Sequence, residues 1–216
     1  ENVIVVILCG SSVDLGEKVR NHAKAIIHAW YPGSQGGLAI AKTLSGENNP
    51  CGKLPVTIYD GEHPLPDFID YNMQGKTYRF IEGDALYPFG YGLSYTKFEY
   101  SDAKVIEKTD DNIKVSVNVK NIGDRAGIEK TQIYAQYTDS RTYTPHFQLC
   151  GIKSTNLEAG ETATVTIDID TYWIKAVLED GQRVTPDGKI TLYIGGHQPD
   201  KVSNELLGYE CEKIEL

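Results

Sequence analysis

Hydrophobic and polar residues follow two different patterns along this chain, and the change falls near residue 95. In the first part the apolar runs are continuous rather than alternating. Val3–Leu8 is apolar at every position, which is typical of a strand buried on both faces of a sheet. Ala25–Trp30 is a second, largely apolar run. Two such strands predict an α/β arrangement for residues 1–95.

Helices are predicted on both sides of the second run. Asp14 followed by Glu17 resembles a capping arrangement, which predicts a short helix near Gly16–Ala25. Apolar residues recur at helical spacing over Leu38–Leu44, and Gly46 follows where many helices end in a left-handed residue. The first part therefore alternates strands with helices.

Proline, glycine and aromatic residues dominate the chain from residue 54 to residue 95. Leu54–Tyr59 predicts an edge strand, because Pro55 cannot donate a hydrogen bond to a sheet. Residues 60–95 predict an ordered connector rather than a flexible linker. Its aromatic side chains need packing partners, and they are Tyr71, Tyr78, Phe80, Tyr87, Phe89, Tyr91 and Tyr95.

Beyond residue 95 the hydrophobic residues recur at every second position. Apolar side chains alternate with polar ones over Ile113–Val119, Val165–Ile169 and Ile190–Ile194. Turn signals that contain glycine occur at residues 121–124, 158–160 and 186–188. Several short alternating strands within residues 96–216 predict an antiparallel β-sandwich of immunoglobulin-like type.

Composition and charge narrow the range of partners. Hydrophobic residues make up 40% of the 216 residues and the formal net charge is −9, which argues against nucleic-acid and membrane-surface partners. The longest apolar run is too short to span a bilayer, and no signal-peptide pattern is visible. Because a buried-strand pattern opens the chain, we interpret its start as a cut, and the sequence leaves the localisation unknown.

Cysteine and histidine spacing indicates neither a metal site nor a redox motif. Cys9, Cys51, Cys150 and Cys211 are widely spaced, so we expect four reduced thiols. A Cys150–Cys211 bridge is the only plausible pairing, because both residues fall in the second part. The five histidines lack the spacing of metal ligands.

Five strings along the chain resemble glycoside hydrolase family 3, the β-glucosidase and β-xylosidase family. They occur in the family's order and cover nearly the whole chain. The strings are Ala29–Gly33 with Gly36 and Gly37 after it, Asn49–Thr57, Gly75–Phe80, Leu86–Thr96 and Asn118–Gly127.

The resemblance implies an architecture and a division of labour. A complete family member has a (β/α)8-like barrel, then an α/β sandwich, often followed by a fibronectin type III-like domain. Residues 1–95 would be the last strands and helices of the α/β sandwich with the connector, and residues 96–216 the fibronectin type III-like β-sandwich. The family's nucleophilic Asp and its acid/base Glu would lie upstream. We therefore assign no catalytic residue here, and two-carboxylate chemistry needs no cofactor.

Trp30 and Tyr31 are the candidate substrate-binding residues. They follow a predicted parallel strand, and ligands of open α/β sheets bind at that edge. An aromatic ring there could stack on a sugar, and the alternative is that Trp30 packs beneath its loop. In that alternative Gly33, Gly36 and Gly37 supply the backbone turns.

The remaining motif residues have structural interpretations beside any contact with ligand. Tyr78 and Arg79 could reach a ligand, but we favour hydrogen bonds of Arg79 that fix the connector. The motif that contains Pro88, Phe89, Gly90 and Gly92 suits close packing between the two parts. The same structural preference holds for acidic residues, because Asp84 falls in a turn and Asp168 and Asp170 on a solvated strand face.

The sequence thus predicts the scaffold part of a retaining β-glycosidase for terminal non-reducing β-linked glucose or xylose. The isolated chain is predicted to be inactive. Its expected partner is the missing N-terminal barrel and α/β portion, or a second copy that pairs across Val3–Leu8. The alternative is an autonomous carbohydrate-binding or adhesion module, which an exposed row of aromatics on one sandwich face would favour.

Overall fold

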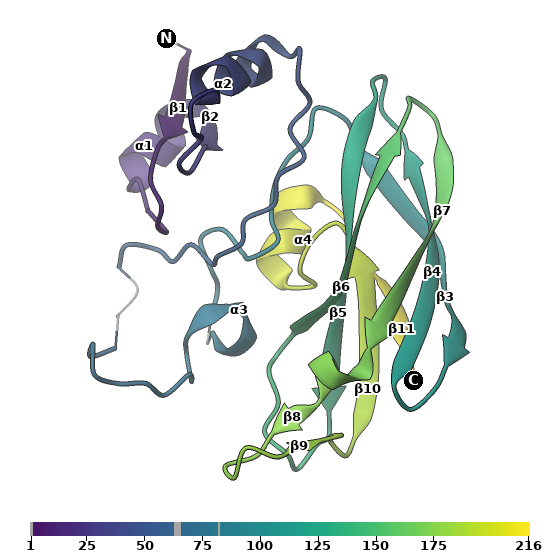
Figure 1. The fold of residues 1–216 in the computed structure, drawn as a ribbon. Coiled ribbons are helices and arrows are strands. Elements are labelled where there is room, and N and C mark those ends of the chain that lie inside the picture. The colour runs from purple at the N-terminus through teal and green to yellow at the C-terminus, as the bar shows by residue number, and fades with distance from the viewer. Residues whose placement is uncertain (1, 63–65, 82) are drawn as a thin grey trace.

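The computed structural model describes residues 2–62, 66–81 and 83–216, and Figure 1 shows a small α/β unit and a connector beside a β-sandwich. The α/β unit contains β1 (Val3–Ile7), α1 (Glu17–His22), β2 (Ala23–His28) and α2 (Gly36–Ser45). The connector contains α3 (Thr77–Phe80). The predicted fold class, an α/β fragment followed by an all-β sandwich, is therefore confirmed.

Two antiparallel sheets form the sandwich. One sheet has the order β11-β10-β5-β6 and the other β3-β4-β7. The bounds are β3 (Phe98–Lys108), β4 (Asn112–Asn121), β5 (Gly127–Thr138), β6 (Gln148–Leu157), β7 (Thr162–Asp170), β10 (Lys189–Gly195) and β11 (Glu212–Glu215). The additional elements are the 3-10 helix η1 (Thr171–Ile174), the small hairpin β8 (Ala176–Val177) and β9 (Arg183–Val184), and α4 (Lys201–Leu207).

The core of the molecule lies between these two sheets. The alternation predicted from the sequence points one set of apolar side chains inward from each strand. β4 contributes Ile113, Val115, Val117 and Val119, and the other sheet contributes Ile133, Leu192 and Ile194. All of them are buried, so the period-two interpretation of residues 96–216 is confirmed.

The α/β unit has no comparable core. β1 and β2 pair in parallel, but Val3, Ile4 and Leu8 are 47%, 48% and 59% exposed. Val3–Leu8 therefore has the apolar composition expected of a strand buried on both faces, but the described residues of this chain do not cover it, and its burial by a partner surface stays a prediction. β1 pairs with β2 along one edge, but side chains project from the faces of a sheet, so they stay in water where no packed layer covers those faces.

The first helix also differs from its prediction. α1 is six residues long, and β2 begins directly after it, so the helix predicted near Gly16–Ala25 is too long. Asp14 does not cap it. The Asp14 carboxylate accepts hydrogen bonds from the backbone N–H groups of Gly16 and Gly61, both at 2.9 Å, and pairs with Arg20. Asp14 therefore joins the loop before α1 to the connector.

The predicted strand at Leu54–Tyr59 is absent from the described structure. The backbone N–H of Ile58 donates to the Tyr87 carbonyl at 2.9 Å, and the two residues form an isolated bridge. The backbone N–H of Leu54 also donates to the Tyr91 carbonyl at 2.8 Å, so the two segments meet at both ends of the predicted strand without forming a continuous ladder. By contrast, α2 ends as predicted, with Gly46 in the left-handed region at φ 78°.

All four cysteines lie among the described residues and are free. Burial raises the pKa of Cys150 and that of Cys211 to about 12. Cys9 is different, because a hydrogen bond with the Ser11 hydroxyl at 3.3 Å lowers its pKa. The thiolate is the nucleophilic form of cysteine, so the thiols are expected to differ in reactivity.

Substitutions in β5 and β6 test the position of the core. Ile133 is fully buried, and Ile133→Ala should lower the free energy of unfolding by about 2–5 kcal/mol. Ile152 in the neighbouring strand is 57% exposed, so Ile152→Ala should change it by less than about 0.5 kcal/mol. Urea unfolding of both variants is the measurement, and equal losses would contradict this core.

Thiol labelling tests the predicted order of reactivity. With Ellman's reagent at mildly alkaline pH, Cys9 should react faster than Cys150 and Cys211 because its thiolate is more populated and more accessible. Cys9→Ser should remove the fast phase, whereas the control Cys211→Ser should retain it. A fast phase that persists in a Cys9→Ser, Cys51→Ser double variant would refute the assignment.

Candidate functional site

The predicted substrate-binding residues follow the carboxyl end of β2. The ring of Trp30 lies 4.0 Å from that of His28, centroid to centroid, and Trp30 has φ 53°. Trp30 is half-buried, whereas Tyr31 is 80% exposed with its ring over Gly10. Trp30 thus packs on the last residue of its own strand, and Tyr31 alone presents a free ring at this edge.

Glycines shape the loop between Tyr31 and α2. Gly33 has φ 71°, in the left-handed region that favours glycine. Gly36 is the buried first residue of α2, and a Cβ there would collide with the ring of Pro32. Gly37, by contrast, has open space around it. The backbone conformation therefore explains the glycine at position 33, and close packing explains the glycine at position 36. Nothing in their geometry requires a ligand.

Tyr78 and Arg79 of α3 contact the sandwich. The Tyr78 ring stacks on Phe89 at 4.1 Å, and the Tyr78 hydroxyl accepts a hydrogen bond from the backbone N–H of Leu149 at 3.2 Å. The Arg79 guanidinium donates to the Gln148 side chain at 2.5 Å, and the Arg79 carbonyl accepts from the His146 N–H. Both residues therefore attach the connector to β6 and the loop before it.

The motif around Gly90 reaches the interior of the sandwich. The Gln132 side-chain amide donates to the Gly90 carbonyl at 3.1 Å and to the Gly196 carbonyl at 2.8 Å. Lys53 donates to the Gly92 carbonyl at 3.0 Å. Burial lowers the pKa of Lys53, and the Glu129 carboxylate partly opposes that shift. Backbone carbonyls of the motif thus receive buried donors from both parts.

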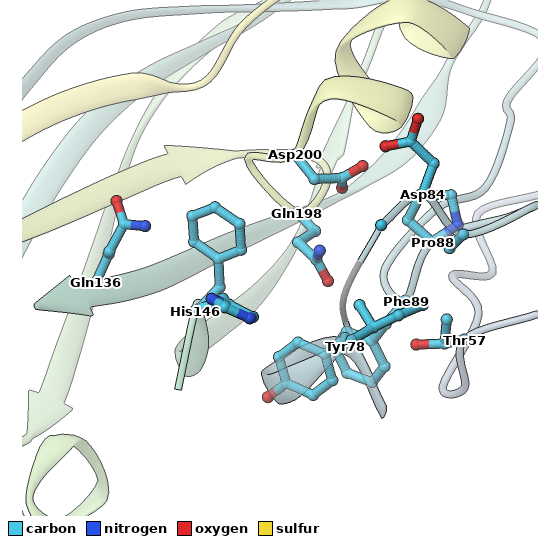
Figure 2. Close-up of a pocket in the computed structure, with 13 residues that line it drawn as sticks. Thr57, Tyr78, Asp84, Pro88, Phe89, Gln136, His146, Gln198 and Asp200 are labelled. Carbon is cyan, nitrogen blue, oxygen red and sulfur yellow. The ribbon is translucent and has the colours of Figure 1, made fainter. Parts of the chain in front are cut away.

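A cavity of about 310 Å³ lies between the connector and the sandwich. Figure 2 shows Tyr78, Phe89 and Thr57 on one side, with Gln198 and Asp200 facing them. Sequence reasoning identified Tyr78, Phe89 and Pro88 as motif residues, included Thr57 in a resembling string and assigned Asp84 to a turn, but it missed the rest of this lining. The missed residues come from separate stretches of the chain, and no local pattern in the sequence brings them together.

The acidic residues have structural roles where the structure shows their contacts. Asp200 caps α4 by accepting hydrogen bonds from the Ser203 N–H at 3.0 Å and the Ser203 hydroxyl at 2.5 Å. Asp168 faces Lys114 at 3.5 Å, and Asp170 accepts a hydrogen bond from the Tyr172 N–H. Asp84 lines the cavity from an exposed position. None of these four is both buried and free of a structural partner.

No group of three potential metal ligands occurs among the described residues, and His63 lies outside them. Within the same part of the chain, no helix has the length and apolar content needed to cross a membrane.

The fold and the motif contacts define an α/β unit that is attached through the connector to a fibronectin type III-like sandwich. Residues 1–95 match the glycosyl hydrolase family 3 C-terminal domain, and residues 129–198 match a fibronectin type III-like domain. The chain therefore belongs to glycoside hydrolase family 3 and carries the C-terminal region of that family.

Relatives of known activity are much longer than this chain. A xylan 1,4-β-xylosidase from Xylanibacter ruminicola is 39% identical over 93% of the chain and 23% of its own length. A periplasmic β-glucosidase from Salmonella typhimurium is 33% identical over 89% of the chain and 27% of its own. Among solved structures, β-glucosidase 3B from Thermotoga neapolitana matches the whole of this chain with a TM-score of 0.86 and 26% sequence identity. The match covers 31% of that protein's own length.

A glycine pair tests the close approach inside the motif. A Cβ at Gly92 would collide with the Gly52 carbonyl oxygen, whereas a Cβ at Gly52 has open space. Gly92→Ala should therefore lower the free energy of unfolding by about 1–3 kcal/mol. Thermal or urea unfolding should show Gly52→Ala within about 1 kcal/mol of the parent chain. A Gly92→Ala variant as stable as Gly52→Ala would contradict the packing.

Proposed function

We propose that this chain is the non-catalytic C-terminal part of a retaining β-glycosidase that removes terminal non-reducing β-linked glucose or xylose. Support for the substrate class comes from the relatives, which include both a β-xylosidase and a β-glucosidase. The chain spans about a quarter of their lengths. The catalytic centre of such an enzyme is thus proposed to lie in the portion that this chain does not contain.

The burial and the hydrogen-bond partners of the acidic side chains support the proposal that the isolated chain is inactive. Retaining hydrolysis needs two carboxyl groups about 5–5.5 Å apart, one of them a proton donor favoured by burial. Among the described residues, Glu129 is the buried acidic side chain, and it accepts a hydrogen bond from the Tyr100 hydroxyl at 2.7 Å. Glu129 is enclosed in the sandwich and does not line the cavity. Within the part of the chain that the structure describes, no second acidic side chain is buried beside Glu129 to complete such a pair.

The proposed role of the chain is to brace the α/β domain. Residues 1–95 would complete that domain, and residues 96–216 would hold it through the connector. The exposed side chains of Val3, Ile4 and Leu8 support this role, because burying each would contribute about 1.5–3 kcal/mol. The proposed cover is the N-terminal barrel and α/β portion, with pairing of two copies across β1 as the alternative.

The distribution of aromatics favours the scaffold over an autonomous binding module. Exposed aromatic residues of the second part are Tyr143, Tyr172 and Trp173. They lie in a loop and in η1, and no strand of the sandwich carries an exposed aromatic residue among those described. A binding module would present a row of exposed aromatic rings on one face of the sandwich, and the strands described here do not form such a row.

Activity assays test this proposal. The purified chain should not hydrolyse chromogenic β-glucosides or β-xylosides above the rate of a buffer blank, because it lacks the two-carboxylate pair. Adding the separately produced N-terminal portion should restore hydrolysis with retention of anomeric configuration, which NMR of the first product can show.

A matched variant separates assembly from catalysis in that experiment. Ile4 lies on β1 and is exposed, and Ile4→Lys should weaken restoration by charging the proposed contact surface. Lys24→Ala, a change at an exposed position of β2, should leave it intact. Turnover by the isolated chain comparable with that of a full-length relative would refute the proposed division of labour.

A further inference from the structure

The cavity between the connector and the sandwich contains two buried polar atoms that lack a hydrogen-bond partner in the described part of the protein. They are the hydroxyl oxygen of Thr57 and the amide oxygen of Gln198. Thr57 is 7% exposed and Gln198 4% exposed, and both residues line the cavity. Native proteins satisfy nearly all such atoms. Two unsatisfied atoms at one cavity therefore indicate a place where a ligand forms hydrogen bonds.

The walls of the cavity are amphipathic. The stacked rings of Tyr78 and Phe89 lie on the connector side, together with Pro88. Figure 2 shows Gln198 on the sandwich side, above these rings in the view. Such a lining suits a ligand that presents an apolar face to the rings and polar groups to the opposite wall.

The two buried oxygen atoms favour a neutral ligand that donates hydrogen bonds. The amide oxygen of Gln198 can only accept, and the Thr57 hydroxyl can accept or donate. Of the carboxylates among the described lining residues, Asp200 caps α4 and Asp84 is exposed, so neither is a buried charge. A cation is therefore not required to balance a buried charge. A hydroxyl-bearing ligand satisfies the buried atoms without bringing a charge into the site.

The size of the cavity limits the ligand to one small ring. Small-molecule pockets range from about 300 to 1,000 Å³, and this one is about 310 Å³. We propose that the cavity binds a neutral polyol the size of a single sugar ring. Its hydroxyl groups bond to Gln198 Oε1 and Thr57 Oγ1, and its apolar face lies toward Tyr78 and Phe89. The inference goes beyond the proposed hydrolysis and uses residues of this chain alone.

Titration of the isotopically labelled chain with D-xylose and D-glucose tests the site by NMR. Saturable shifts in the millimolar range of ligand or below are expected at the Gln198 side-chain amide and at the backbone of Gly83 and Phe89. Methylammonium chloride, a small organic cation, should not saturate the same signals. Absence of saturable sugar shifts, shifts confined to Trp30 and Tyr31, or binding of methylammonium alone would each overturn the proposal.

Threonine variants make the test specific to one atom. Thr57→Val removes the hydroxyl and should weaken sugar binding by about threefold to tenfold, the effect of one hydrogen bond. Thr57→Ser keeps the hydroxyl and should restore most of the affinity. Thr131→Val makes the same change at a fully buried threonine outside the cavity, and binding should remain at the parental level. Equal weakening by both valine variants would show that the loss reflects the fold and not the site.

Because the titration measures binding by this chain without turnover, its result is independent of the activity assays. Sugar binding with failed restoration of activity would support the site and refute the proposed enzyme. Restored activity without sugar binding would do the opposite.

Discussion

The side-chain amide of Gln132 is the interaction on which the joining of the two parts depends. It is buried in β5, and its two N–H groups donate to the carbonyls of Gly90 in the connector and Gly196 in the sandwich. Its oxygen accepts from the Tyr134 hydroxyl at 2.6 Å. Both N–H groups and the oxygen of the amide thus have hydrogen-bond partners away from water. Loss of any partner would leave a buried group unsatisfied, at a cost of about 1–3 kcal/mol.

The same amide sets the position of both walls of the cavity. Phe89 directly precedes Gly90, and Gln198 follows Gly196 by two residues. A Cβ at Gly90 would approach the Gln132 and Tyr134 side chains at 2.5 Å, so the backbone can come this close only without a side chain. The space between the aromatic wall and the polar wall therefore follows from how the connector packs on the sandwich. The hydrogen bonds of the buried Gln132 amide to Gly90 and Gly196 determine that packing.

Sequence reasoning succeeded where structure follows from neighbours in the chain. The alternation of Ile113–Val119 predicted a strand of the sandwich, because the pleat of a strand places every second side chain on one face. At Val3–Leu8 the apolar run indicated a demand for burial, and the exposed side chains of Val3, Ile4 and Leu8 show that the described residues do not meet it. Sequence reasoning missed the cavity, because Thr57 and Gln198 are 141 positions apart, the difference between their residue numbers. Only the docking of the connector brings them to one space.

The two parts of the chain consequently differ in how far their own residues stabilise them. The sandwich closes its apolar faces on each other, so Ile133, Leu192 and Ile194 are removed from water by residues of the same sandwich. The α/β unit pairs β1 with β2 but leaves Val3 and Ile4 about half exposed. Its remaining support comes through polar contacts with the sandwich and the connector, which position a surface but bury little apolar area. A sandwich with a closed core attached to an α/β unit with a partly uncovered strand agrees with the proposed bracing role, since burial of Val3 and Ile4 by a complementary surface would contribute about 1.5–3 kcal/mol each.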